Sequence, residues 1–366
     1  MKEDSAIKFL IECIRKDNYK DFKEIISNYI KNHSIDWKGM ENPYLQRAFL
    51  LFYNRIINFP KIPKEIKKEL MLQYMNNYAR NTKIKELAIN LSKKFNNKNI
   101  DAIFLKGASL LFTIYKKDIA ERHMQDIDVL VRKEDIKKAQ EILIKNRFKR
   151  YLKFPVEKEL HYLSNKGNIM LELHCNIGSD VTNEQMNDIF KSYKIINYKN
   201  TQVKISDAEY TIITACLNFI RDSCYRSEYF FPYKKELKDN LYFSPFFFLA
   251  EMKKLLEYYK SEIDWKRFFK IVSSYKEEYK IIASLCIMRR VFNLEIPVEN
   301  VKIKNIYAGT FIRLSKIISK DKPIKHLLLM RDIDMFYEGM KLINKPTLLI
   351  RKLPWIFKRA TKKWKI

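Results

Sequence analysis

The residues best suited to chemistry are two aspartates two positions apart, Asp126 and Asp128, in the apolar segment DIDVLV. Alternate residues of a strand point to the same face, so both carboxylates would project together from a sheet. Two like charges this close raise each other's pKa, and both stay ionised readily only where a cation lies between them. We therefore expect a site for Mg²⁺ (or Mn²⁺), a hard cation that binds carboxylates together with substrate phosphates.

A third carboxylate, Glu172, lies in the apolar segment IMLEL further along the chain. On a neighbouring strand it would complete the set with which two metal ions support in-line attack on phosphorus. Alternating aspartates alone are a weak signal, because half-exposed strands often carry them. The upstream turn strengthens the interpretation: Lys106-Gly107 closes one apolar run and opens a helix, where a glycine allows close approach to a phosphate and Lys106 adds positive charge.

Together these segments resemble the uncharacterised bacterial nucleotidyltransferases, a branch of the polymerase-β-like nucleotidyltransferase superfamily. The resemblance is motif-specific only over residues 104–174, and it is carried by Leu105-Lys106-Gly107, Tyr115, Arg122, residues 126–131 and Glu172-Leu173-His174. It implies transfer of a nucleoside monophosphate from an NTP donor such as ATP to an unidentified acceptor: RNA, a small molecule, a sugar or a peptide. The implied catalytic and metal-binding residues are Asp126, Asp128 and Glu172; the implied substrate-binding residues are Lys106, Gly107, Ser109, Arg122 and His174.

Several of these residues also have ordinary explanations. Ser109 is displaced by one position from the family's Gly-Ser turn, and Glu172 stands where family members often carry aspartate. Arg122 could bind phosphate or a catalytic carboxylate, or form a structural ion pair. His174 could orient Glu172, touch substrate or be a structural histidine. The other histidines carry no spacing signal: His33, His123, His161 and His326.

The spacing of apolar residues predicts an α+β fold, in which a small mixed β-sheet core is flanked by N-terminal and C-terminal helical regions. The resemblance implies that this sheet is the nucleotidyltransferase core. Residues 1–97 form the first helical region. Residues 98–203 form the core, with a hairpin turn at Lys166-Gly167. Residues 204–366 form the second helical region and end in a basic tail.

The net charge of +28 would attract polyanions such as RNA or an anionic membrane. Because the excess lysine is spread over the chain, diffuse surface charge is the alternative. The tail at residues 351–365 mixes basic and aromatic residues, which fits an interfacial helix, a nucleic-acid contact or a merely solvated face. A catalytically silent family member that binds RNA or an acidic partner is therefore the alternative function.

Other classes of protein are disfavoured. The five cysteines are scattered without a CxxC pair, so neither a zinc site nor a disulfide framework is indicated. The sequence lacks the P-loop, dinucleotide-binding, hydrolase and zinc-protease motifs. Because no secretory signal or long apolar run is present, we expect a cytoplasmic protein.

Overall fold

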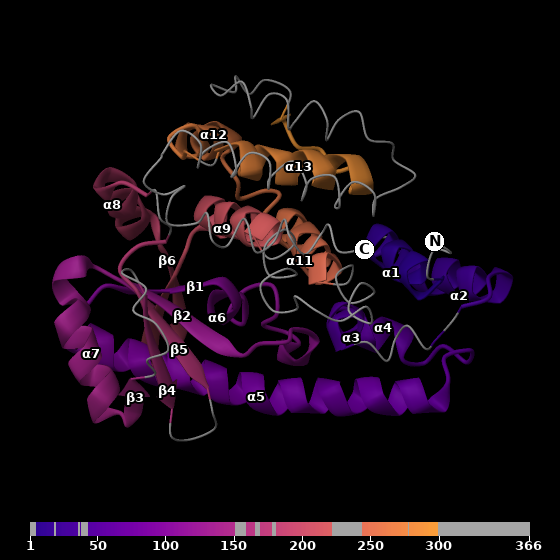
Figure 1. The fold of residues 1–366 in the computed structure, drawn as a ribbon, viewed down its shortest axis with the longest axis horizontal. Helices are drawn as coiled ribbons and strands as arrows, with labels where there is room; N and C mark the ends of the chain where they lie inside the picture. Colours follow the sequence, from indigo (N-terminus) through magenta and orange to yellow (C-terminus); the bar gives the residue numbers. More distant parts are fainter. Residues whose placement is uncertain are drawn as a thin grey trace, which may run out of the picture.

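The computed structural model describes residues 5–17, 20–35, 37, 43–150, 159–164, 169–177, 181–221, 244–276 and 278–298. The predicted hairpin turn at Lys166-Gly167 and the basic tail at residues 351–365 lie outside the described residues. A mixed sheet surrounded by helices confirms the predicted α+β fold (Figure 1).

The sheet has seven strands in the order β3-β4-β5-β2-β1-β7-β6. The central strand β2 is antiparallel to β1 and parallel to β5, and β1 is parallel to β7 on its other side. Two antiparallel hairpins, β4 with β5 and β6 with β7, extend the sheet in opposite directions. The strands are β1 Ala102–Leu105, β2 Asp126–Val131, β3 Phe148–Arg150, β4 Glu159–Ser164, β5 Met170–His174, β6 Lys194–Tyr198 and β7 Thr201–Ile205.

The two middle strands are apolar on both faces because both faces are covered. Every residue of β1 is buried, as is every residue of β2 after Asp126. Asp128, the third residue of β2, is therefore an exception, because a buried carboxylate requires compensation by nearby positive groups or hydrogen bonds.

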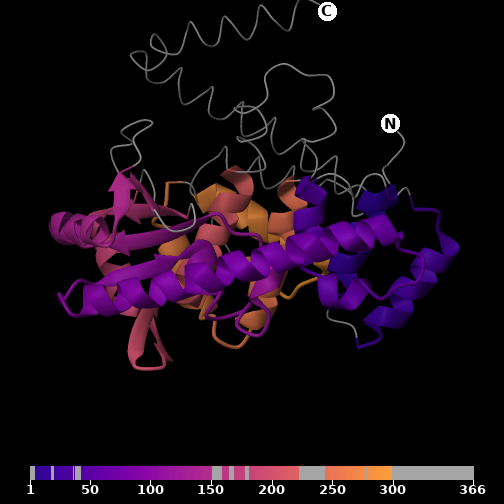
Figure 2. The same cartoon turned by 90° about the horizontal axis from the view of Figure 1, so that it is seen from below.

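A single long helix, α5 (Lys64–Asn96), supports one side of the molecule. Pro63 stands at its N-cap, and the helix runs beside the sheet from the N-terminal helices to the region of α7 (Figures 1 and 2). It packs against β7 and against the short segment that leads into β2. The helices before it are α1 Ser5–Lys16, α2 Phe22–Asn32, α3 Pro43–Leu50 and α4 Tyr53–Ile56.

The remaining helices lie between the strands or after them. α9 packs against both α11 and α13, and Asp264 caps α12 by accepting hydrogen bonds from the backbone N–H groups of Lys266 and Arg267. No helix in the described parts of the chain combines the length and apolar character needed to cross a bilayer. The helical segments are α6 Lys106–Leu110, η2 Ile119–Glu121, η3 Lys133–Asp135, α7 Ile136–Lys145, α8 Asn183–Ser192, α9 Ala208–Arg221, α11 Ser244–Tyr258, α12 Trp265–Val272 and α13 Glu278–Phe292.

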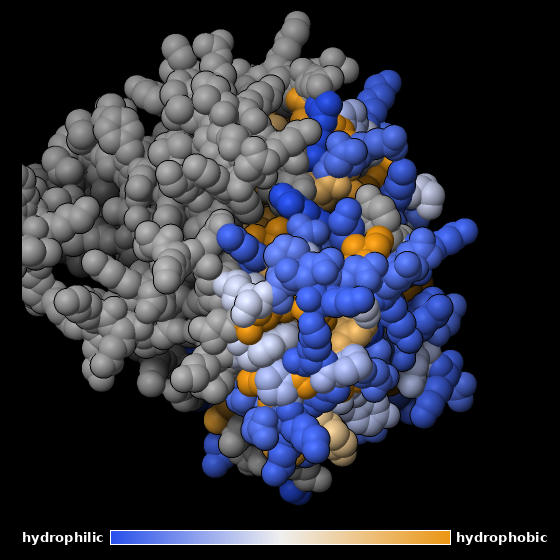
Figure 3. Space-filling view, turned by 90° about the vertical axis from the view of Figure 1, so that its right-hand side faces the viewer, coloured by the Kyte–Doolittle hydropathy of each residue, from blue (hydrophilic) through white to orange (hydrophobic). Residues whose placement is uncertain are grey.

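The surface at the end of the molecule where α2 lies is largely hydrophilic. Apolar side chains appear there only as small separate spots between charged and polar ones (Figure 3). The coloured part of this face therefore shows no large continuous apolar patch.

Candidate active site

Strand register brings the predicted residues to one place in the middle of the sheet. Asp128 on β2 lies directly opposite Glu172 on the parallel strand β5, and His174 follows two residues later on the same face of β5. On the other side of β2, Asp128 pairs with Leu105, the last residue of β1. Lys106 comes directly after that strand, so it reaches the same carboxylate.

Asp128 is the buried centre of the site. Its side chain is 3% exposed, and its Oδ1 atom accepts hydrogen bonds from Lys106 Nζ at 2.5 Å and from His174 Nε2 at 2.9 Å. Burial on its own would raise the pKa of Asp128. The charge of Lys106 and the hydrogen bond from His174 outweigh that effect and hold the pKa well below its usual range. Asp128 is therefore ionised at neutral pH.

The surroundings of Glu172 favour its protonated form, whereas those of Asp128 favour the ionised form. Its Oε2 atom is 3.6 Å from His174 Nε2, and its Oε1 atom is 3.6 Å from His161 Nδ1 on β4. Burial, followed by the negative charge of Asp128, raises the pKa of Glu172 to about 7. Two neighbouring carboxylates whose pKa values are pushed apart in this way are typical of sites that bind a cation or move a proton.

The donor set fits a metal ion. Asp128, Glu172 and His174 each offer one ligand atom, and these atoms lie within 4.8 Å of one another. Asp126 is on the same face of β2 but outside this group, and its charge acts on Glu172 from the edge of the site. Carboxylate oxygens suit hard cations such as Mg²⁺, whereas the imidazole also suits softer ones. A bound ion would share Asp128 with Lys106.

The turn that carries Lys106 is strained. Lys106 has φ of 46°, a left-handed conformation that residues with a side chain rarely adopt. The turn places its ammonium group on Asp128. Ser109, one of the predicted substrate-binding residues, is buried and donates its hydroxyl to the carbonyl of Lys106 at 2.8 Å. The hydroxyl of Ser109 thus supports the turn.

Arg122 forms a bidentate ion pair with Glu251 of α11. Arg122 Nε is 2.6 Å from Glu251 Oε1, and Nη2 is 3.1 Å from Oε2. Tyr115 adds a hydrogen bond of 3.2 Å to Glu251. The guanidinium group also covers Gly107, where an added Cβ would lie 2.2 Å from Arg122 Nη1. Of the two interpretations of Arg122, the ion pair is the one seen, and it binds the Lys106-Gly107 turn to α11.

His161 is a neighbour of the site that the sequence interpretation missed. It pairs with Glu172 across the antiparallel β4–β5 hairpin. That is the register that a two-residue turn at Lys166-Gly167 would set, because the residues that pair are equally distant from the turn. Counting back from the predicted turn would therefore have found His161.

Comparison with known proteins gives one match. The model of a family described as uncharacterised nucleotidyltransferase matches residues 46–293. This span contains the whole sheet and the helices from α4 to α13, so it includes every residue of the site. No curated protein and no solved structure matches the chain.

Proposed function

Since this chain belongs to the uncharacterised nucleotidyltransferase family, we propose that it is a Mg²⁺-dependent enzyme that transfers a nucleoside monophosphate from an NTP to an acceptor. The observation that carries the proposal is the buried, ionised Asp128 opposite Glu172, with Lys106 and His174 on the same carboxylate oxygen. A fold does not bury such a group without compensation, and phosphoryl-transfer sites require such negative charge to hold a divalent cation.

The carboxylates of Asp126, Asp128 and Glu172 would hold the ion. Bound Mg²⁺ would neutralise phosphate charge and favour ionisation of the attacking hydroxyl group. His174 keeps Asp128 in one orientation through its 2.9 Å hydrogen bond, and His161 stands beside the other oxygen of Glu172. Such neighbours fix the direction of a carboxylate before a ligand arrives.

The donor triphosphate would bind on the side of Lys106 and Gly107. The ammonium group of Lys106, which lies on Asp128, would add positive charge toward the phosphates. Arg122 contributes by fixing the turn from behind, through its contact with Gly107 and its ion pair with Glu251. Positioning and charge neutralisation supply most of the rate in this class of reaction.

The test is turnover of radiolabelled NTPs with Mg²⁺ or Mn²⁺ in the presence of cell extract. We expect Asp126→Asn together with Asp128→Asn to lower labelling about a hundredfold or more, because both changes remove charge from the metal site. The matched control is Asp101→Asn together with Asp135→Asn, two aspartates outside the site that should leave labelling unchanged. If the first double variant labels acceptors as well as wild type does, the proposal is wrong.

One observation favours a second function, that of a catalytically silent member that binds RNA or an acidic partner. Lys106 already neutralises Asp128, so the buried carboxylate is compensated by the chain itself. The same preparation distinguishes the two functions. An enzyme should gain thermal stability from NTP with Mg²⁺, since a ligand bound only by the folded state stabilises it, whereas a silent member should not.

A further inference from the structure

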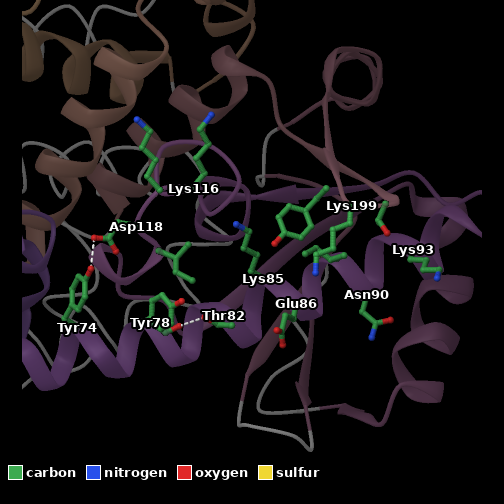
Figure 4. Close-up of a pocket in the computed structure, with 15 residues that line it drawn as sticks. Tyr74, Tyr78, Thr82, Lys85, Glu86, Asn90, Lys93, Lys116, Asp118 and Lys199 are labelled. Atoms are coloured by element: carbon green, nitrogen blue, oxygen red, sulfur yellow. Dashed lines mark hydrogen bonds between the residues drawn. The ribbon is translucent and has the colours of Figure 1, made fainter. Parts of the chain in front are cut away.

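A hollow lies away from the carboxylate site, along α5. It has a volume of about 700 Å³ and lies between α5, the segment after α6 and the β6–β7 hairpin (Figure 4). None of the residues assigned above to the nucleotidyltransferase site lines it. We name it the α5 groove.

The α5 groove is positively charged. Its two acidic residues are Glu86 and Asp118, and the carboxylate of Asp118 is already hydrogen-bonded to neighbouring residues. The carboxylate of Asp118 accepts hydrogen bonds from Tyr74 at 2.7 Å, from the backbone N–H of Ala120 at 3.1 Å and from Asn54. Within the described residues none of the lysines in the groove pairs with a carboxylate: Lys85, Lys93, Lys116, Lys117 and Lys199.

The groove is elongated because one helix forms its floor. The lining residues on α5 run from Tyr74 to Lys93. Most of them recur after three or four residues and two pairs are adjacent, which keeps them on one side of the helix (Figure 4). That stretch covers about 28 Å at 1.5 Å per residue. Lys116 and Lys199 belong to the two elements that border the floor. The lysines are therefore distributed over the length of the floor and over the two elements that border it.

Aromatic rings lie among these charges. The ring of Tyr78 is on the exposed face of α5, where the residue is 57% exposed. Lys85 extends into the groove, with its Nζ 5.1 Å from the centre of the Tyr198 ring and 5.4 Å from that of Phe112. Such cation–π contacts hold the ammonium group in place without neutralising it. The exposed ring and the fixed charge are thus both available to a ligand.

We propose that the α5 groove binds a segment of single-stranded RNA. Non-specific single-strand sites combine a line of positive charge, which follows the phosphates, with aromatic rings on which bases stack. Charge complementarity selects a polyanion, and the length of the groove selects a chain rather than a compact phosphate. Tyr78 stacks on a base, while Lys116, Lys117 and Lys199 contact phosphates.

The experiment measures binding of a fluorescein-labelled oligouridylate of about twelve nucleotides to the full-length protein by fluorescence anisotropy. Neither NTP nor Mg²⁺ is added. Charge reversal of the groove, Lys116→Glu with Lys117→Glu and Lys199→Glu, should weaken binding at least about tenfold. It should also lower the slope of log affinity against log salt by about 2, since each phosphate contact on a single strand adds about 0.7.

The matched control reverses three exposed lysines elsewhere, Lys133→Glu with Lys137→Glu and Lys145→Glu, on η3 and α7. Both triple variants have the same net charge, so diffuse attraction changes equally in both. The control should stay within about threefold of wild type at physiological salt, where distant surface charges are screened. Equal weakening in the two triples would overturn the proposal.

Two further variants make the test specific. Tyr78→Ala should weaken binding about fivefold or more because a stacked base is lost, whereas Tyr78→Phe should keep it. Unchanged binding in Tyr78→Ala and in the groove triple would overturn the proposal. Asp126→Asn with Asp128→Asn should bind the strand like wild type, so failure of nucleotidyl transfer and failure of RNA binding are distinguishable.

Discussion

Gly107 lies beneath the guanidinium group of Arg122, and a methyl group at its Cα would meet Arg122 Nη1 at 2.2 Å and Cζ at 2.9 Å. In an ordinary helix the change from glycine to alanine is stabilising by roughly 0.5–1 kcal/mol. Here we expect the opposite sign. Gly107→Ala should lower the free energy of unfolding by about 1–3 kcal/mol, as overpacking does, measured by urea denaturation.

A double-mutant cycle identifies the cause of this cost. In an Arg122→Leu background the guanidinium group is absent, so Gly107→Ala should cost much less than it does in wild type. Additive effects of the two changes would show that Gly107 is needed for another reason, such as the conformation of the turn itself.

At the residue scale, the sequence predicts those site residues whose positions follow from strand alternation. Asp128, Glu172 and His174 meet because each lies on one face of a strand, and Lys106 meets them because it ends the neighbouring strand. Alternation cannot predict a partner that lies on a distant helix. Nothing in the sequence pairs Arg122 with a glutamate 129 residues away, although an ion pair was one of its two interpretations.

At the scale of elements, α11 is fixed to the core by that ion pair. Arg122 is 11% exposed and Glu251 9% exposed, and removal of one partner from a buried pair leaves the other charge uncompensated. We expect Glu251→Gln to lower the free energy of unfolding by about 3 kcal/mol in urea denaturation. It should also raise the KM for NTP, because the Lys106-Gly107 turn loses its support.

The matched control is Glu262→Gln. Glu262 pairs with Lys194, and the two side chains are 42% and 39% exposed. Water already screens that pair, so the same substitution should cost less than about 1 kcal/mol. Equal costs for the two variants would mean that the buried pair does not hold α11 in place.

Long helices are the elements that the sequence predicts best. α5 begins directly after Pro63 and runs for 33 residues without a glycine or proline, with apolar residues at helical spacing toward both ends and two buried asparagines, Asn77 and Asn81, between them. The β6–β7 hairpin is harder to predict, because β6 alternates only between exposed and half-buried residues. β7 runs to Ile205, two residues past residue 203. The position of β7 beside β1 depends on a parallel pairing between segments that are distant in the sequence, which is hard to predict.

At the scale of the whole molecule, the charge of +28 makes the local arrangement of charge more informative than its total. The positive groups around the carboxylate site are paired, Lys106 with Asp128 and Arg122 with Glu251. In the described part of the chain, the lysines of the α5 groove have no carboxylate partner. Excess charge thus remains where a polyanion can reach it.

Global stability should also depend on pH through His123. Its Nδ1–H donates to Asn77 Oδ1 at 3.2 Å, while its Nε2 is buried without a hydrogen-bond partner among the described residues. Protonation of Nε2 would create a buried N–H without an acceptor. Burial, followed by the charge of Arg47, lowers the pKa of His123 to about 3, whereas an unfolded histidine titrates near 6.5.

Between pH 6.5 and about 3 the unfolded chain therefore binds a proton at His123 that the folded chain does not bind. The contribution of neutral His123 to the free energy of unfolding is fully present above the pKa that histidine has in the unfolded chain. It is lost as pH falls below that pKa, at about 1.4 kcal/mol per pH unit. In His123→Gln this loss should vanish, because glutamine does not titrate. Urea denaturation of both proteins from pH 7.5 to 4.5 measures the difference between their free energies of unfolding at each pH. Because both proteins contain Glu172, its contribution cancels in that difference. Parallel profiles would show that His123 gains its proton in the folded protein as well.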